Sequence, residues 1–208
     1  MIINTKTFEN LPFCEKEILR YAGCKSVDND VVSLMHSCID EVSPSLSYKI
    51  CWCELDVTVC GTECGFGDFC VDSKVLAKFL DSSQTVILMA ATVGVAIDRL
   101  IAKYGRISPS RALMIQAIGS ERIEALCDAF CRDSGCNTRF SPGYGDLPLS
   151  VQKDIFRILD CEKKIGMYLS ENLIMTPSKS VTAFAKMGIA HNKCTDCTKI
   201  DCEYRGAI

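Results

Sequence analysis

RFSPGYGDLP (residues 139–148) is a short segment between two helical patterns that contains two prolines and two glycines. Glycine lets a backbone approach a ligand closely, and proline stiffens the chain around it. Arg139 opens the segment with a guanidinium that suits a carboxylate, and Tyr144 adds a flat ring and a hydroxyl. The segment therefore indicates either a ligand-binding loop or an ordinary helix connector with a surface arginine.

Apolar periodicity on both sides of this segment predicts a mixture of helices and strands. Helical patterns cover residues 14–22, 31–42, 73–80, 95–104, 109–132 and 150–165. Strand patterns cover residues 46–59, 85–91, 167–175 and 180–187, and a glycine-rich connector or hairpin covers residues 60–70. Because the two kinds of element do not alternate regularly, the predicted fold class is α+β.

Length and charge limit the organisation and the possible partners. The 208 residues predict one domain over residues 1–187 and a short cysteine-rich tail over residues 188–208. A net charge of -3, without a basic block, argues against a nucleic-acid partner. The longest apolar stretch, residues 86–91, is too short to span a bilayer, and no targeting segment is evident. We therefore expect a cytoplasmic protein with no membrane partner.

Four motifs in sequence order give the segment a wider context. Arg-x-x-Pro-Gly-Tyr at 139–144 resembles the S-adenosylmethionine loop in the activation domain of cobalamin-dependent methionine synthase. The motifs that follow are similar to that family too: Glu-Lys-x-x-Gly at 162–166, Leu-Ser-Glu at 169–171 and Met-x-Pro-x-x-Ser-Val at 175–181. The resemblance is good over residues 112–181 and absent after Lys186. It implies a mostly antiparallel, curved sheet covered by helices.

The resemblance also implies a ligand site. The residues that it assigns to S-adenosylmethionine are Arg139, Phe140, Ser141, Gly143, Tyr144 and Glu124. Arg139 would meet the methionine carboxylate, Gly143 and Tyr144 would shape the pocket, and Phe140 and Ser141 would contribute backbone contacts. Glu124, on the preceding alanine-rich helix, would face the ligand, although a solvated helix face is an equally good reading for a glutamate.

The function implied by the resemblance is reductive reactivation in methionine biosynthesis. S-adenosylmethionine would be presented as methyl donor to cob(II)alamin on a corrinoid-binding methionine synthase or a related methyltransferase, and a flavoprotein would supply the electron. No proton-transfer residue is required, so no catalytic side chain is expected. The family's last strands have no match here. The alternative is therefore a non-enzymatic corrinoid-protein partner or metal-binding module that has lost S-adenosylmethionine binding.

Fifteen cysteines raise a second possibility, a metal or redox site. Cys194, Cys197 and Cys202 have a spacing that suits an iron–sulfur cluster, or zinc with a fourth ligand. His191 could supply that ligand, as could a cysteine from elsewhere. The other candidate donors are Cys51, Cys53, Cys60, Cys64 and Cys70. The opposing interpretation is a metal-free tail.

The remaining cysteines are expected to act as small packing residues. They are Cys14, Cys24, Cys38, Cys127, Cys131, Cys136 and Cys161. Cys51 and Cys53, two residues apart in a strand pattern, should lie on one face of that strand.

Overall fold

The structure is a computed structural model that describes residues 1–187. Its elements in chain order are β1 (Asn4–Phe8), α1 (Glu15–Tyr21), α2 (Asn29–Val42), η1 (Ser43–Ser45), β2 (Tyr48–Asp56), β3 (Thr58–Cys60), β4 (Glu63–Phe66), β5 (Phe69–Asp72), α3 (Lys74–Phe79), β6 (Thr85–Thr92), α4 (Ala96–Tyr104), α5 (Pro109–Ser134), β7 (Cys136–Phe140), η2 (Leu149–Val151), α6 (Gln152–Leu159), α7 (Cys161–Ile165), β8 (Tyr168–Leu169), β9 (Met175–Thr176) and β10 (Ser180–Met187).

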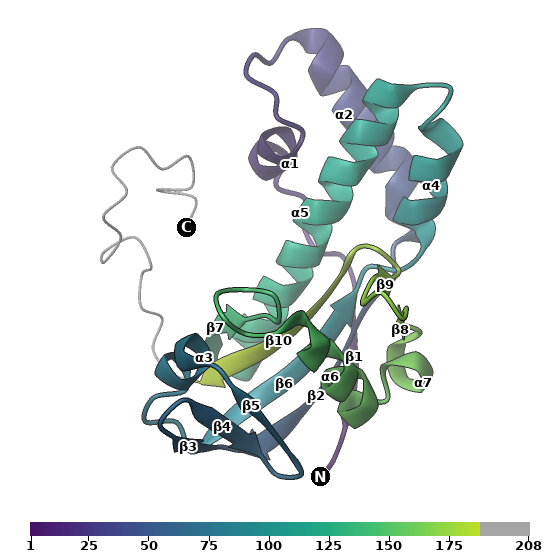
Figure 1. Cartoon of the computed structure of the whole chain (residues 1–208). Coiled ribbons are helices and arrows are strands. Elements are labelled where there is room, and N and C mark those ends of the chain that lie inside the picture. The colour runs from purple at the N-terminus through teal and green to yellow at the C-terminus, as the bar shows by residue number, and fades with distance from the viewer. Residues whose placement is uncertain (188–208) are drawn as a thin grey trace.

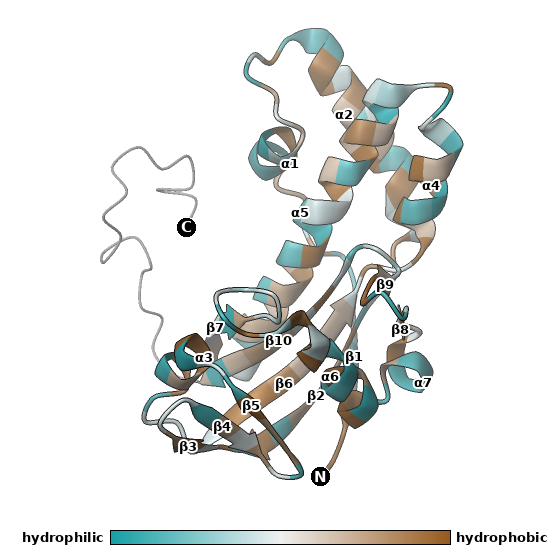
Figure 2. Cartoon of the chain, viewed as in Figure 1, coloured by the Kyte–Doolittle hydropathy of each residue, from teal (hydrophilic) through white to brown (hydrophobic). Residues whose placement is uncertain are grey.

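Five strands form one antiparallel sheet in the order β1-β2-β6-β10-β7 (Figure 1). β6 lies in the middle and is buried on both faces. Its odd-numbered residues between 87 and 91 belong to one core, and its even-numbered residues between 86 and 90 belong to the other. Coverage of both faces explains why this strand reads as a continuous apolar run, visible as brown ribbon in Figure 2. The predicted α+β class with a mostly antiparallel sheet is confirmed.

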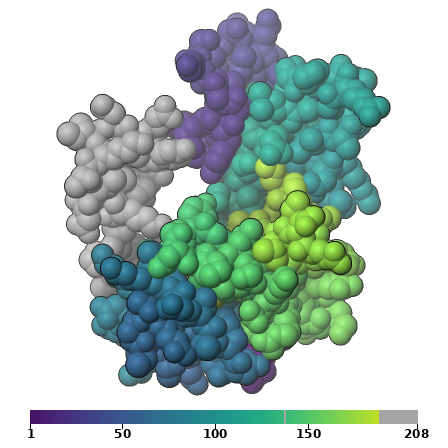
Figure 3. Space-filling view, viewed as in Figure 1, coloured from purple at the N-terminus to yellow at the C-terminus, as the bar shows by residue number. Residues whose placement is uncertain are grey.

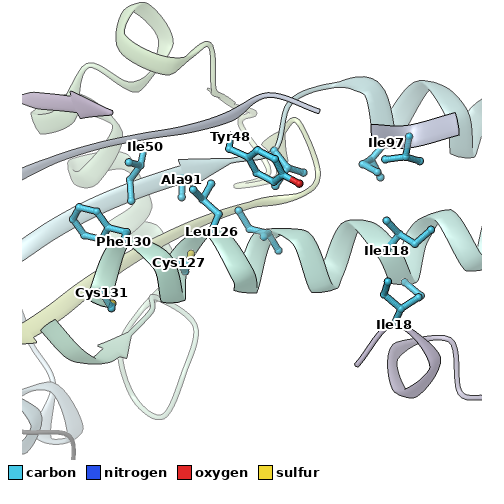
Figure 4. Packing of buried hydrophobic residues seen from close by; sticks show 14 of the residues in the cluster. Ile18, Tyr48, Ile50, Ala91, Ile97, Ile118, Leu126, Cys127, Phe130 and Cys131 are labelled. Carbon is cyan, nitrogen blue, oxygen red and sulfur yellow. The ribbon is translucent and has the colours of Figure 1, made fainter. Parts of the chain in front are cut away.

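Helices cover both faces of the sheet. α1, α2, α4 and α5 contribute to the core on one face. Figure 4 shows Ile50, Leu126 and Phe130 at the sheet end of this core and Ile118 near Ile18 and Ile97 at its helical end. α3, α6, α7 and β4 contribute to the core on the other face. β3, β4 and β5 form a separate antiparallel meander. α5 links the two ends of the molecule, because it packs against α1, α2 and α4 and also against β6 and β10.

A buried ion pair on α5 was not foreseen from the sequence. Arg122 pairs with Glu121, and their side chains are only 0% and 5% exposed. Arg122 also donates hydrogen bonds to the backbone oxygens of Leu11 (2.7 Å) and Pro12 (2.6 Å). The pair therefore reaches from α5 to the segment that precedes α1.

Further contacts complete this attachment. The Arg122 guanidinium lies over the Phe13 ring, 3.9 Å from its centroid, and donates to the Tyr48 hydroxyl at 3.3 Å. Glu121 accepts the backbone N–H of Cys14 at 3.1 Å. A single arginine–glutamate pair thus holds residues 11–14 against α5.

Three expected elements differ in the structure. The helix predicted over residues 150–165 is interrupted at Asp160, whose φ of 48° is left-handed, and becomes η2, α6 and α7. The strand predicted over residues 167–175 is only the short hairpin of β8 and β9. For residues 60–70, the hairpin alternative is confirmed by the pairing of β4 with β5, but β3 also pairs with β4 and extends the hairpin to a three-stranded meander.

The cysteines divide between core and surface. Cys51 and Cys53 share one face of β2 and are buried, as predicted. Cys14 is exposed and Cys24 is half-buried, so the packing role expected for them is wrong. Cys14 comes directly before α1 and Cys24 comes after its C-terminal end, so neither lies on the buried face of that helix. Over residues 1–187, no group of three or more histidine, cysteine, aspartate or glutamate side chains could hold a metal ion. Within the same residues, no helix is long and apolar enough to cross a membrane.

Candidate functional site

The segment quoted first is the end of a strand followed by a tight loop. Arg139 and Phe140 belong to β7, so the expectation that Arg139 opens a loop is wrong: β7 pairs with β10, placing Arg139 opposite Ala185. The loop begins at Ser141 and closes where the Gly143 N–H donates to the Leu147 oxygen at 2.9 Å. Gly143 has a φ of 90°, which glycine adopts without strain.

Asp146 fastens this loop to the N-terminus of α3. Its carboxylate accepts hydrogen bonds from the Ser73 hydroxyl (2.5 Å) and the backbone N–H groups of Lys74 (2.8 Å) and Val75 (3.2 Å). Ser73 is also the N-cap residue of α3, where its side chain accepts the backbone N–H of Leu76. These hydrogen bonds, led by the one from Ser73, lower the pKa of Asp146. The loop is therefore held by a charge that persists at neutral pH.

We expect Asp146→Ala to loosen the loop. Hydrogen exchange at Lys74 and Val75, and in the loop, should become faster than in wild type. Because the folded-state pKa of Asp146 lies below its usual 3.8, this stabilisation is present above that pH and is lost as the pH falls below it. Asp68→Ala, which removes a carboxylate that is 75% exposed, is the matched control. Unchanged exchange in Asp146→Ala would contradict this account of the loop.

A cavity of about 600 Å³ opens beside Arg139, a size within the range of small-molecule sites. Its lining residues from the β7 region are Arg139, Phe140, Ser141, Pro142 and Tyr144. Those from β9 and β10 are Met175, Ser180, Val181 and Thr182, and the helices add Glu124 and Gln152. Antiparallel pairing of β7 with β10 thus brings two motifs, 139–144 and 175–181, to one pocket. In Figure 3 the green loop and α6 lie between the blue and yellow-green segments of this face.

Arg139 supplies the positive charge of the pocket. Its guanidinium donates to Glu124 Oε2 at 2.9 Å and to Asp128 Oδ1 at 2.8 Å. Residues 124, 128 and 131 follow one another on one face of α5, so Arg139 lies along that face. Burial favours the neutral guanidinium, but the acidic groups around it raise the pKa of Arg139 above its usual value. Arg139 is a fixed cation whose two carboxylate partners are themselves largely exposed, at 46% and 58%.

Two pocket side chains have unsatisfied polar atoms. Within residues 1–187, Gln152 Oε1 and Thr182 Oγ1 are buried without a hydrogen-bond partner, and only Ser83 Oγ shares that condition. An unsatisfied buried polar atom costs about 1–3 kcal/mol. Both Gln152 and Thr182 line the cavity beside Arg139. A bound molecule with polar edges would satisfy them, so the pocket fits a polar ligand with a carboxylate.

We expect Thr182→Val to separate ligand binding from stability. The valine has nearly the same shape and removes an unpaired hydroxyl, so the free energy of unfolding should stay equal or rise slightly. Affinity for the pocket's ligand should fall by about tenfold. Thr182→Ser, which keeps the hydroxyl, is the control. Urea unfolding and calorimetric titration measure the two quantities, and a destabilised variant with unchanged affinity would contradict a ligand role.

The residues assigned to the ligand from the sequence lie together, with one exception. Arg139, Phe140, Ser141, Tyr144 and Glu124 line the cavity. Gly143 does not line it and instead shapes the loop from within. Tyr144 is 66% exposed at the mouth of the cavity. The sequence analysis missed Gln152 and Thr182, because neither belongs to one of the four motifs. Their only sequence signal is their position, Gln152 shortly after the loop and Thr182 two residues after Ser180. Cys194, Cys197, Cys202 and His191 lie outside the described residues.

Comparisons with known proteins point to the same region. The family model described as "Vitamin B12 dependent methionine synthase, activation domain" matches residues 131–201, about a third of the chain. This match starts at the end of α5, takes in β7, the loop and β10, and continues past the described residues to residue 201. The expectation that the resemblance is absent after Lys186 is therefore wrong. No curated protein matches the sequence.

A solved structure shares the fold. It is described as "Crystal Structure of the MetH Reactivation Domain bound to AdoHcy", with a TM-score of 0.69 and 13% sequence identity. The similarity covers 91% of this chain and 81% of the other. By fold, this chain is an α+β domain similar to that reactivation domain. The resemblance to the activation domain of vitamin B12-dependent methionine synthase, first found in four sequence motifs, is confirmed.

Proposed function

We propose that this protein binds S-adenosylmethionine in the cavity beside Arg139 and presents its methyl group during reactivation of a corrinoid methyltransferase. One observation carries the proposal: one cavity is lined by a partly buried cation, Arg139, and by two residues with unsatisfied polar atoms, Gln152 and Thr182. A zwitterionic amino acid joined to a nucleoside offers a carboxylate and several hydrogen-bonding groups. The solved relative's description, which names AdoHcy, supports the same class of ligand.

Each side chain has a distinct task in this proposal. Arg139 receives the ligand carboxylate, because its fork-shaped guanidinium suits a planar anion. Glu124, 2.9 Å from Arg139, is placed to receive the ligand's amino group. Gln152 and Thr182 provide partners for the remaining polar atoms. Tyr144, exposed at the mouth, offers a flat face that a ligand can cover.

The proposed reaction needs no acid or base from this chain. One electron from a flavoprotein reduces the partner's cob(II)alamin to the cob(I) state, and methyl transfer from S-adenosylmethionine then gives methylcobalamin and S-adenosylhomocysteine. The chain holds the donor by its amino-acid end and leaves the methyl group free to meet the corrinoid. Its contribution is proximity and orientation, effects that can supply a large part of a rate enhancement.

An alternative is a corrinoid-protein partner that has kept the fold without binding S-adenosylmethionine. Under that alternative, the pocket would have lost its polar lining or its cation. The intact Arg139 with its flanking acids and the two unsatisfied polar atoms favour ligand binding instead.

An anaerobic methyl-transfer assay tests the proposed function. The protein is mixed with a cob(II)alamin-bearing methyltransferase, S-adenosylmethionine labelled in its methyl group, and a one-electron reductant. We expect labelled methylcobalamin only when the protein is present. Label on the corrinoid at the same rate without the protein, or none with it, would contradict the proposal. Arg157→Ala, at an exposed arginine that does not line the cavity, should behave as wild type.

We also propose a metal or iron–sulfur cluster held by Cys194, Cys197 and Cys202. Three thiolates with this spacing can bind one metal centre. After anaerobic purification, the wild type should contain metal, and Cys194→Ser/Cys197→Ser should lose it. Cys14→Ser, at an exposed cysteine of the described domain, is the control. Equal metal content in all three proteins would exclude this site.

A further inference from the structure

Two cysteines lie sulfur to sulfur behind the pocket arginine. Cys131 lies in the last turns of α5 (Figure 4), and Cys136 is the first residue of β7, just after the left-handed Gly135. The Cys136 thiol donates a hydrogen bond to Cys131 Sγ over 2.8 Å. A disulfide bond measures about 2.05 Å, so the two sulfurs are less than about 1 Å from bonding distance. Both thiols are free in this structure.

Arg139 connects this pair to the pocket. Its Nη1 atom lies 3.8 Å from Cys131 Sγ and 2.8 Å from Asp128 Oδ1. Cys131 therefore receives two donors, the Cys136 thiol and the Arg139 guanidinium. The hydrogen bond from Cys136, with help from the charge of Arg139, lowers the pKa of Cys131 despite its burial. A thiolate beside a protonated thiol is the arrangement of an attacking and a resolving cysteine.

Other buried cysteines lack this combination. Cys161 is hydrogen-bonded to Cys51 across the second core, but that bond and burial raise the pKa of Cys161. Burial raises the pKa of Cys127, one turn before Cys131, to about 12. Cys131 is distinguished by its position near the sheet edge formed by β7 and by its 8% exposure.

We propose that Cys131 and Cys136 form a reversible disulfide whose formation removes a thiolate from Arg139 and frees the guanidinium for the ligand carboxylate. A hydroperoxide is the oxidant. The Cys131 thiolate attacks the peroxide oxygen, the O–O bond breaks, and a sulfenic acid and hydroxide result. The Cys136 sulfur then attacks Cys131 Sγ, and the S–OH bond breaks to release water. Two thiols and one hydrogen peroxide thus give one disulfide and two waters, and a dithiol reductant reverses the change.

The consequence for the ligand rests on the proposed function. A disulfide sulfur carries no charge. In the reduced protein, Arg139 has three negative neighbours, Glu124, Asp128 and the Cys131 thiolate, and oxidation leaves only the two carboxylates. The oxidised protein should therefore bind S-adenosylmethionine more tightly, by about fivefold or more. Oxidising conditions also convert corrinoids to the state that needs reactivation, so the direction of the effect suits the proposed role.

Peptide mapping of the full chain tests the disulfide directly. The protein is treated anaerobically with a small excess of hydrogen peroxide, quenched by alkylation under denaturing conditions and digested. We expect a linked Cys131–Cys136 peptide that disappears after dithiothreitol treatment. Cys136→Ser should instead accumulate a Cys131 sulfenic acid that reacts with dimedone. Cys24→Ser, at a half-buried cysteine away from the pair, should still form the disulfide.

The wild-type result alone is decisive, even if a substituted protein folds poorly. Unlinked, alkylated Cys131 and Cys136 in folded wild type at this peroxide level would overturn the proposal. Titration of S-adenosylmethionine into the reduced and oxidised proteins tests the coupling, and equal affinities would overturn it. If the proposed function fails, neither form binds the ligand while the disulfide still forms, so the two failures can be told apart.

Discussion

Arg139→Ala is expected to weaken S-adenosylmethionine binding by about 2–4 kcal/mol, or roughly 30- to 1000-fold in Kd. The guanidinium is the charged partner of the ligand carboxylate in our account, and alanine leaves that carboxylate without one. The fold should survive, because the carboxylates that lose Arg139, on Glu124 and Asp128, are 46% and 58% exposed and remain solvated. Calorimetric titration measures the affinity and urea unfolding measures the stability.

Two variants sharpen this experiment. Arg139→Lys keeps the charge but loses the planar fork, so its affinity should lie between those of wild type and Arg139→Ala. Arg157→Ala removes a positive charge from an exposed ion pair and should leave affinity unchanged. An Arg139→Ala protein that binds the ligand as well as Arg157→Ala does would show that the carboxylate is held elsewhere.

Arg122→Met should lower the free energy of unfolding by about 3–5 kcal/mol. The substitution leaves the buried Glu121 carboxylate without its partner and the backbone oxygens of Leu11 and Pro12 without their donor. Urea unfolding gives the size of the loss. Arg157→Met is the control for removal of an exposed arginine and should change stability by less than about 0.5 kcal/mol.

A double-variant cycle isolates the buried charge. In wild type, Glu121→Gln should be destabilising, because it leaves Arg122 buried without a counter-ion. On the Arg122→Met background, the same substitution should be stabilising, because it removes an unpaired buried carboxylate. The same sign on both backgrounds would contradict the view that Glu121 and Arg122 act as a pair.

Much of the fold could be predicted because long elements carry their own patterns. The apolar run of β6 and the long helix α5 were both found, since burial of two sheet faces and of a helix face leaves a clear periodicity. β1 and β7 were missed because edge strands are short and partly polar, reading NTKTF and CNTRF. Their pairing depends on neighbours that are distant in the sequence, β2 and β10.

The part of the candidate site that could be predicted is the part that lies in or beside recognisable motifs. Motif similarity found Arg139 and Glu124, which the structure joins in an ion pair. It could not find Gln152 or Thr182, whose role follows only from burial without a hydrogen-bond partner. The closeness of Cys131 and Cys136 likewise depends on the turn at Gly135, which returns the chain beside α5.

Site-resolved hydrogen exchange with and without S-adenosylmethionine tests the central claim most directly. The account predicts that saturating ligand slows exchange in peptides covering residues 139–148 and 175–182, which border the cavity beside Arg139. Peptides of β3, β4 and β5 should not change. No protection at millimolar ligand, or protection confined to another part of residues 1–187, would contradict the assignment of this pocket to S-adenosylmethionine.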